Sequence, residues 1–94
     1  MNSNNSIQVK IDVNVLLQEL EDEAVLLNLT DEHYFGLDDV GLRFWQLLDK
    51  HGNSEDVIRD MKIEYNAPED TLHKDLGKFI IELESAGLLS IIEP

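Results

Sequence analysis

The residues best suited to chemistry in this sequence are three histidines and a surplus of carboxylates. His33, His51 and His73 lie far apart along the chain and lack the i, i+4 spacing by which a helix presents a pair of metal ligands. The chain has no cysteine, which excludes disulfides, thiol catalysis and thiolate metal sites. The acidic run Glu19–Glu23 lacks the glycine and the ligand spacing of a calcium loop. We therefore expect no metal ion and no cofactor.

Catalysis is also disfavoured, because the sequence has no glycine-rich phosphate loop and no nucleophile-base signature. With 94 residues the chain can form a single core, but it has no second lobe with which to build an interdomain cleft. The function is therefore expected to come from a binding surface.

Charge limits the partners of that surface. The net charge of −13 repels phosphate backbones and anionic lipids, so we expect neutral or basic partners and neither nucleic acid nor membrane. No apolar run is long enough to span a bilayer, and no signal peptide is recognisable. These features favour a cytoplasmic location.

The chain is expected to consist of a flexible polar segment, residues 1–12, and a single folded domain, residues 13–94. Ile7–Ile11 alternates apolar and polar residues, which fits either a short strand or an extended arm. No internal repeat or low-complexity segment interrupts the folded part.

The first half of the domain predicts strands. Val13–Leu20 and Ala24–Leu29 are apolar runs separated by an acidic turn, and His33–Leu37 follows as a third strand. Together they predict an antiparallel meander whose last strand has an open edge. Alternation places His33, Phe35 and Leu37 on one face of that strand and Tyr34 and Gly36 on the other.

Three helices are predicted after the strands. Asp38 is a favourable N-cap for the first helix, which ends near Gly52. The second begins at Asn53 or Ser54, and the third begins near Pro68, since proline suits a first helical turn. Apolar residues of the third helix recur at helical spacing: Leu72, Leu76, Phe79, Ile80 and Leu83. Strands followed by helices favour an α+β, winged-helix-like fold, with a three-stranded N-terminal antiparallel sheet followed by three α-helices.

Several sequence landmarks occur together and in a characteristic order. They are the run Ala24–Leu29, the corner Tyr34–Gly41, the pattern Trp45-x-Leu47-Leu48, the pattern Tyr65-x-x-Pro68, and the helical pattern from Asp75 to Leu89. This set resembles the PqqD-like family, small peptide chaperones that bind the leaders of ribosomally made, post-translationally modified peptides. The corner with its trailing tryptophan is most similar to the discrete leader-binding proteins of lasso-peptide clusters.

The resemblance implies a mode of binding. A leader peptide would add as an antiparallel strand to His33–Leu37 and lie in a groove against the helix Pro68–Ala86. An open edge offers N–H and C=O groups that a peptide backbone satisfies, while side-chain pockets select the sequence. The implied peptide-binding residues are His33, Tyr34, Phe35, Gly36, Leu37, Thr71, Asp75, Lys78, Phe79 and Glu82. The implied partners are the precursor's leader, a leader-removing protease and an ATP-dependent cyclase.

Other interpretations remain open from the residues alone. Tyr34, Phe35 and Phe79 are also typical of a core, and Gly36 also suits a bend into the helix. A winged-helix DNA-binding regulator is the main alternative, but recognition helices use Arg and Lys. The third helix instead carries Glu69, Asp70, Asp75, Glu82 and Glu84 against Lys74 and Lys78. An open edge strand also permits a homodimer.

Overall fold

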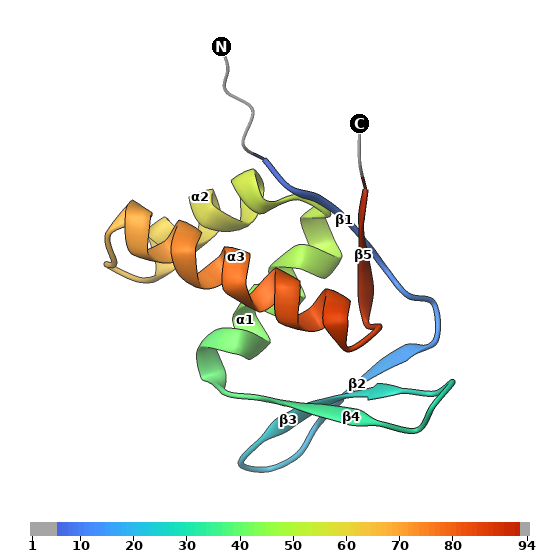
Figure 1. Cartoon of the computed structure of the whole chain (residues 1–94). Helices are drawn as coiled ribbons and strands as arrows, with labels where there is room; N and C mark the ends of the chain where they lie inside the picture. Colours follow the sequence, from blue (N-terminus) through green and yellow to red (C-terminus); the bar gives the residue numbers. More distant parts are fainter. Residues whose placement is uncertain (1–5, 93–94) are drawn as a thin grey trace.

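Strands come first and helices follow, with a last strand that returns to the beginning of the chain (Figure 1). The computed structural model describes residues 6–92. The elements are β1 (Gln8–Ile11), β2 (Val15–Glu19), β3 (Ala24–Asn28), β4 (Tyr34–Leu37), α1 (Asp39–His51), α2 (Ser54–Glu64), α3 (Glu69–Ser85) and β5 (Leu89–Ile92). The predicted α+β, winged-helix-like fold is therefore confirmed.

The β2–β3–β4 sheet is an antiparallel meander with the helices on one side of it (Figure 1). Leu26 in the central strand is fully buried and faces the helices. Alternation along β4 places Phe35 and Leu37 on that inner face, while Tyr34 is 75 % exposed. Among residues 6–92, β4 pairs only with β3, so its other edge is open as expected.

A second, two-stranded sheet joins the ends of the described chain. β1 pairs antiparallel with β5, and Val9 of β1 is buried. The strand alternative for Ile7–Ile11 is thus the one the fold adopts, and the folded part begins before residue 13. The apolar residues that follow α3 form a strand because β1 supplies their hydrogen-bond partner. Residues 1–5 of the expected flexible segment lie outside the described residues.

Side-chain caps and a left-handed glycine set the helix boundaries. The Asp38 carboxylate accepts the Gly41 N–H at 2.7 Å at the start of α1. Gly52 ends α1 with a φ of 75°, a conformation that favours glycine. Asn53 is the N-cap of α2 and accepts the Asp56 N–H. The helix starts follow the sequence prediction, except that α3 begins one residue after Pro68.

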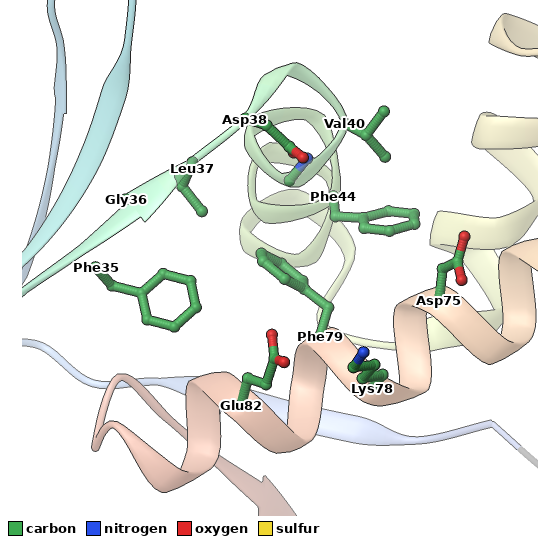
Figure 2. Close-up of a pocket in the computed structure, with 11 residues that line it drawn as sticks. Phe35, Gly36, Leu37, Asp38, Val40, Phe44, Asp75, Lys78, Phe79 and Glu82 are labelled. Carbon is green, nitrogen blue, oxygen red and sulfur yellow. The ribbon is translucent and has the colours of Figure 1, made fainter.

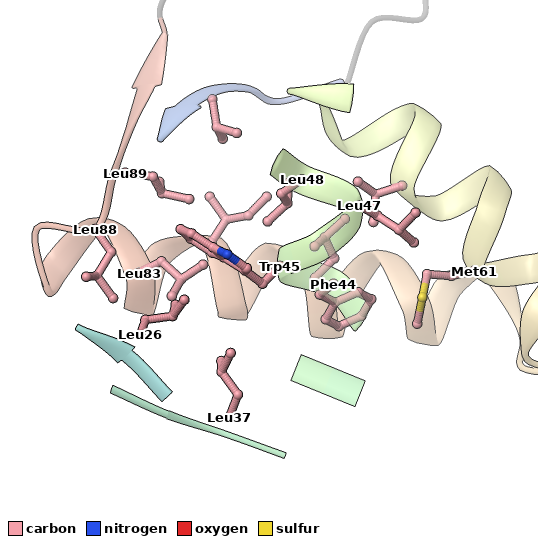
Figure 3. Packing of buried hydrophobic residues seen from close by; sticks show 14 of the residues in the cluster. Leu26, Leu37, Phe44, Trp45, Leu47, Leu48, Met61, Leu83, Leu88 and Leu89 are labelled. Carbon is pink, nitrogen blue, oxygen red and sulfur yellow. The ribbon is translucent and has the colours of Figure 1, made fainter. Parts of the chain in front are cut away.

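The core lies between the β2–β3–β4 sheet and the three helices. Trp45 and Leu48 of α1 are buried there with Leu26 of the sheet and Leu83 of α3 (Figure 3). No helix within residues 6–92 is both long enough and apolar enough to cross a membrane.

An ion pair joins α1 and α2 at the protein surface. Arg43 of α1 donates two hydrogen bonds to the carboxylate of Glu64 in α2, at 2.7 and 2.6 Å. These hydrogen bonds lower the pKa of Glu64 from its ordinary value.

Asp38 provides a test of how the strand-to-helix corner is held. Replacing Asp38 with alanine should lower the free energy of unfolding by about 1 kcal/mol, because the Gly41 N–H loses its acceptor. Asp38→Asn keeps an acceptor at the same position and should retain most of the stability. Urea unfolding of both variants measures the difference, and an alanine variant as stable as the parent would exclude a capping role.

Candidate functional site

A groove of about 490 Å³ lies where β4, α1 and α3 meet (Figure 2). Its lining residues come from all three elements: Phe35, Gly36, Leu37, Asp38, Val40, Gly41, Phe44, Asp75, Lys78, Phe79 and Glu82. The chain passes directly from β4 into α1 at the N-cap Asp38, so the end of β4 and the first turns of α1 both line the groove. We call this site the β4–α3 groove.

Three phenylalanines form the apolar floor of the β4–α3 groove (Figure 2). The ring of Phe79 from α3 lies 6.3 Å from that of Phe35, edge to face, and 5.7 Å from that of Phe44. Such arrangements are favourable for aromatic pairs. Phe35 and Phe79 are only partly buried, so the floor offers aromatic surface to a ligand.

Gly41 allows α1 to approach this floor closely. A Cβ at this position would lie 3.1 Å from the Asp38 Oδ1 and 3.5 Å from the Phe79 ring. A larger residue would therefore press against both the helix cap and the aromatic floor. The glycine, which is otherwise unfavourable in a helix, has a packing reason here.

The open edge of β4 borders the same groove. The Asn28 N–H of β3 donates to the His33 carbonyl at 2.9 Å, which fixes the hydrogen-bonding phase of the β3–β4 ladder. In an antiparallel pair, successive residues alternate between bonding the neighbouring strand and facing away from it. Phe35 therefore directs its N–H and C=O to β3, whereas Tyr34 and Gly36 direct theirs to the open edge.

The space over Gly36 is also open, because an added Cβ would meet no atom within 4 Å. Because Gly36 shares the outer face of β4 with Tyr34, this open space lies on the outer face of the sheet.

The rim of the β4–α3 groove is polar and mainly acidic. Asp75, Lys78 and Glu82 project from α3. Asp38 lies between the C-terminal end of β4 and the start of α1 (Figure 2). Three carboxylates against one ammonium favour a ligand that is neutral or basic at its edges.

The structure brings together seven of the ten residues proposed from the sequence. Phe35, Gly36, Leu37, Asp75, Lys78, Phe79 and Glu82 line the groove. The other three do not line it: His33 and Tyr34 have exposed side chains, and Thr71 lies one helical turn before Asp75. Tyr34 nevertheless contributes its backbone to the open edge.

The contribution of α1 was missed. Val40, Gly41 and Phe44 line the groove, but in the sequence they are indistinguishable from a core-facing stripe. Gly41 was the available signal, because a glycine in the first turn of a helix often marks a close contact.

A second hollow lies between α2 and α3 and includes Ile58, Lys62 and His73. Within residues 6–92, no group of three or more histidine, aspartate or glutamate side chains is placed to hold a metal ion.

Comparison with known proteins identifies the fold and its relatives. Residues 23–89 match the family model described as coenzyme PQQ synthesis protein D (PqqD). None of the curated protein sequences compared with the chain matches it. A solved structure described as TbiB1 in complex with the TbiA(beta) leader peptide is 35 % identical in sequence, with a TM-score of 0.81. The match covers 90 % of this chain and 99 % of that one.

A second solved structure, described as lasso peptide synthetase B1 complexed with the leader peptide, shares the fold. It is 21 % identical with a TM-score of 0.73, and the match covers 88 % of this chain and 98 % of the other. The family model spans most of the chain, including β3, β4, the three helices and the whole β4–α3 groove. The chain therefore belongs to the PqqD family, as a PqqD-like recognition element for ribosomally made, modified peptides.

Proposed function

We propose that this chain binds the leader of a ribosomally made precursor peptide, by strand addition to β4 over the β4–α3 groove. The observation that carries the proposal is the edge at Tyr34 and Gly36, which no strand of residues 6–92 pairs with and which lies directly beside a groove with an aromatic floor. Main-chain hydrogen bonds would supply affinity, and the groove would select side chains. The 35 % identical relative, whose structure is a complex with a leader peptide, supports the same assignment.

A strand added to β4 would contact both features: its backbone would bond the open edge, and alternate side chains would enter the groove. Side chains of a strand alternate between faces, so every second residue of a leader on β4 would point toward Phe35 and Phe79. The intervening residues would point to the outer face of the sheet. This arrangement suits a leader with apolar anchors at alternate positions and a backbone free to bond β4.

The biological role that follows is presentation without catalysis. A bound leader raises the effective concentration of the precursor at a modifying enzyme. We propose that the enzymes served are a leader-removing protease and an ATP-dependent cyclase of a lasso-type system, in the cytoplasm where the precursor is made. The chain itself would carry no catalytic group.

Calorimetric titration tests the proposal. The first ligand is the TbiA(beta) leader, which the 35 % identical relative binds in its solved complex, and the cognate leader is then sought among short peptides encoded near the gene for this chain. We expect one-to-one binding with a Kd of about 10 μM or tighter for the cognate leader, since two apolar anchors and strand hydrogen bonds exceed the cost of ordering the peptide. A scrambled leader of the same composition is the control. Equal affinity for the scrambled peptide, or no binding of the cognate leader, would contradict the proposal.

We also expect no appreciable affinity for nucleic acid. The chain has a net charge of −13, and α3, the element that a winged helix would place in the major groove, is mainly acidic. A gel-shift titration with random-sequence duplex DNA at low salt, where attraction is least screened, is the strictest measurement. Micromolar binding under those conditions would favour a DNA-binding regulator instead.

A further inference from the structure

Gly36 of β4 is a glycine that the fold itself does not require. Its φ lies outside the left-handed region, which among the described glycines is occupied by Gly52 and Gly87. An added Cβ would meet no atom within 4 Å, so no neighbouring group demands a small residue here. The chain passes into α1 only at Asp38. Because glycine weakens a strand by leaving no side chain to pack, its presence in β4 indicates a reason outside the folded chain.

The open space over Gly36 lies on the outer face of the sheet, which no helix of residues 6–92 covers (Figure 1). The strand register pairs Gly36 with Val25 of β3, whose half-buried side chain points to the same face. Tyr34, two residues before Gly36, also points to that face and is 75 % exposed. The space is therefore bordered by one β-branched and one aromatic side chain. We call Val25, Tyr34 and Gly36 the outer Gly36 site.

The backbone of Gly36 faces the open edge of β4, so the outer Gly36 site is continuous with the proposed leader site. In an antiparallel leader strand, one residue would lie directly opposite Gly36 and exchange both backbone hydrogen bonds with it. Residues directly opposite each other point to the same face of a sheet, so this leader side chain would point outward, over Gly36. The leader residues before and after it would point into the β4–α3 groove, toward Phe35 and Phe79.

The dimensions of the outer Gly36 site favour an aromatic side chain. Neighbouring strands lie roughly 4.8 Å apart, so a leader side chain must cross the full width of β4 to reach Val25. A flat ring can lie across a glycine of an edge strand, whereas any side chain at position 36 would occupy the same place. The ring would then contact Val25, and pairs of an aromatic and a β-branched side chain are favourable across strands. A small leader side chain would leave Val25 and Gly36 uncovered.

From these observations we propose that the outer Gly36 site is a second specificity subsite, which takes an aromatic side chain of the leader on the face of the sheet opposite the β4–α3 groove. This inference rests on the proposed function. It adds that the leader is recognised on both faces of the sheet: apolar anchors enter the groove, and an aromatic residue between two of them lies over Gly36 against Val25.

Gly36→Thr tests the subsite, because threonine fills the space over position 36 and leaves the groove and the N–H of the open edge in place. Threonine has the higher strand propensity, so the variant should unfold at the same urea concentration as the parent or a higher one. It should bind the TbiA(beta) leader, and the cognate leader once identified, about fivefold more weakly, since the ring loses part of its burial. Gly77→Ala in α3 is the matched control, because an added Cβ there also meets no atom within 4 Å and Gly77 does not line the groove. Its leader affinity should stay within about twofold of the parent.

A double-mutant cycle identifies the leader residue that occupies the subsite. Each aromatic residue of the leader is replaced by alanine in turn, and each peptide is titrated into the parent and into Gly36→Thr. At the position opposite Gly36, alanine should weaken binding to the parent about fivefold and binding to Gly36→Thr less than about twofold. At positions that enter the groove, alanine should weaken binding to both chains alike. Additive effects at every aromatic position would overturn the inference.

The outcomes separate this inference from the proposed function. If a leader binds the parent and slows exchange of the Gly36 amide, but Gly36→Thr binds it equally well, the inference is wrong and the proposed function stands. If no leader binds the parent, the proposed function itself fails, and the inference with it. Nuclear Overhauser effects between the Gly36 α-protons and a leader ring should appear in the saturated complex, and their absence would also contradict the inference.

Discussion

Replacing Phe79 with alanine should weaken leader binding about 10- to 100-fold, the largest effect expected of any single side chain in the β4–α3 groove. Phe79 lies between Phe35 and Phe44 and connects the strand to α1 across the floor. Burying a large apolar side chain contributes roughly 1.5–3 kcal/mol, whereas an exposed ion pair contributes about 0–1 kcal/mol. The affinity should therefore depend on the aromatic floor more than on the charged rim.

Rim variants and salt provide the comparison. Asp75→Asn, Lys78→Gln and Glu82→Gln should each change leader affinity less than about threefold. Raising the salt from about 50 mM to about 500 mM should also leave most of the affinity in place, since apolar contacts are not screened. Phe79→Leu, which keeps an apolar side chain at the site, separates loss of the floor from loss of folding. If high salt abolishes binding and Phe79→Ala does not weaken it, the assignment of the binding energy is wrong.

A proline at Tyr34 should weaken leader binding about tenfold or more while the domain stays folded. The Tyr34 N–H faces the open edge of β4, so proline removes a donor to the leader without removing a β3–β4 hydrogen bond. The ring also stands where the peptide backbone would approach, and the leader carbonyl that it faces is left without a partner. Calorimetry with the cognate leader measures the loss.

Two matched variants isolate the backbone effect. Tyr34→Ala removes the same side chain but keeps the N–H, and it should bind the leader within about threefold of the parent, because the Tyr34 side chain does not line the groove. Glu19→Pro places a proline on the opposite edge of the sheet, in β2, and should leave leader affinity unchanged. Full-strength binding by a folded Tyr34→Pro variant would exclude docking on the β4 edge.

Local patterns in the sequence were sufficient to predict most of the fold. Asp38 and Gly52 have strong preferences for helix ends, and the structure uses both residues there. Alternation in His33–Leu37 correctly separated Phe35 and Leu37 from Tyr34 and Gly36, because a strand has only two faces. The PqqD-like resemblance added the functional surface, which no single residue pattern identified.

Contacts between distant segments were harder to predict. Val9 packs in the core from a strand whose pairing partner, β5, comes from the other end of the described chain, and neither short segment indicates its partner. Thr71 shares a helical face with Asp75, yet the groove ends before it, because the lining depends on how α3 passes β4 and α1. Phe44 illustrates the same limit: helical spacing identifies an apolar face but not whether that face meets the core or a groove.

Hydrogen exchange of individual backbone amides provides the most direct test of the central claim, that a leader adds as a strand to the open edge of β4. The Phe35 amide already bonds β3, whereas those of Tyr34 and Gly36 face the open edge. On binding the cognate leader, exchange at Tyr34 and Gly36 should slow at least about tenfold, and exchange at Phe35 should change much less. If the leader saturates the chain while Tyr34 and Gly36 exchange as fast as before, the peptide binds elsewhere and strand addition to β4 is contradicted.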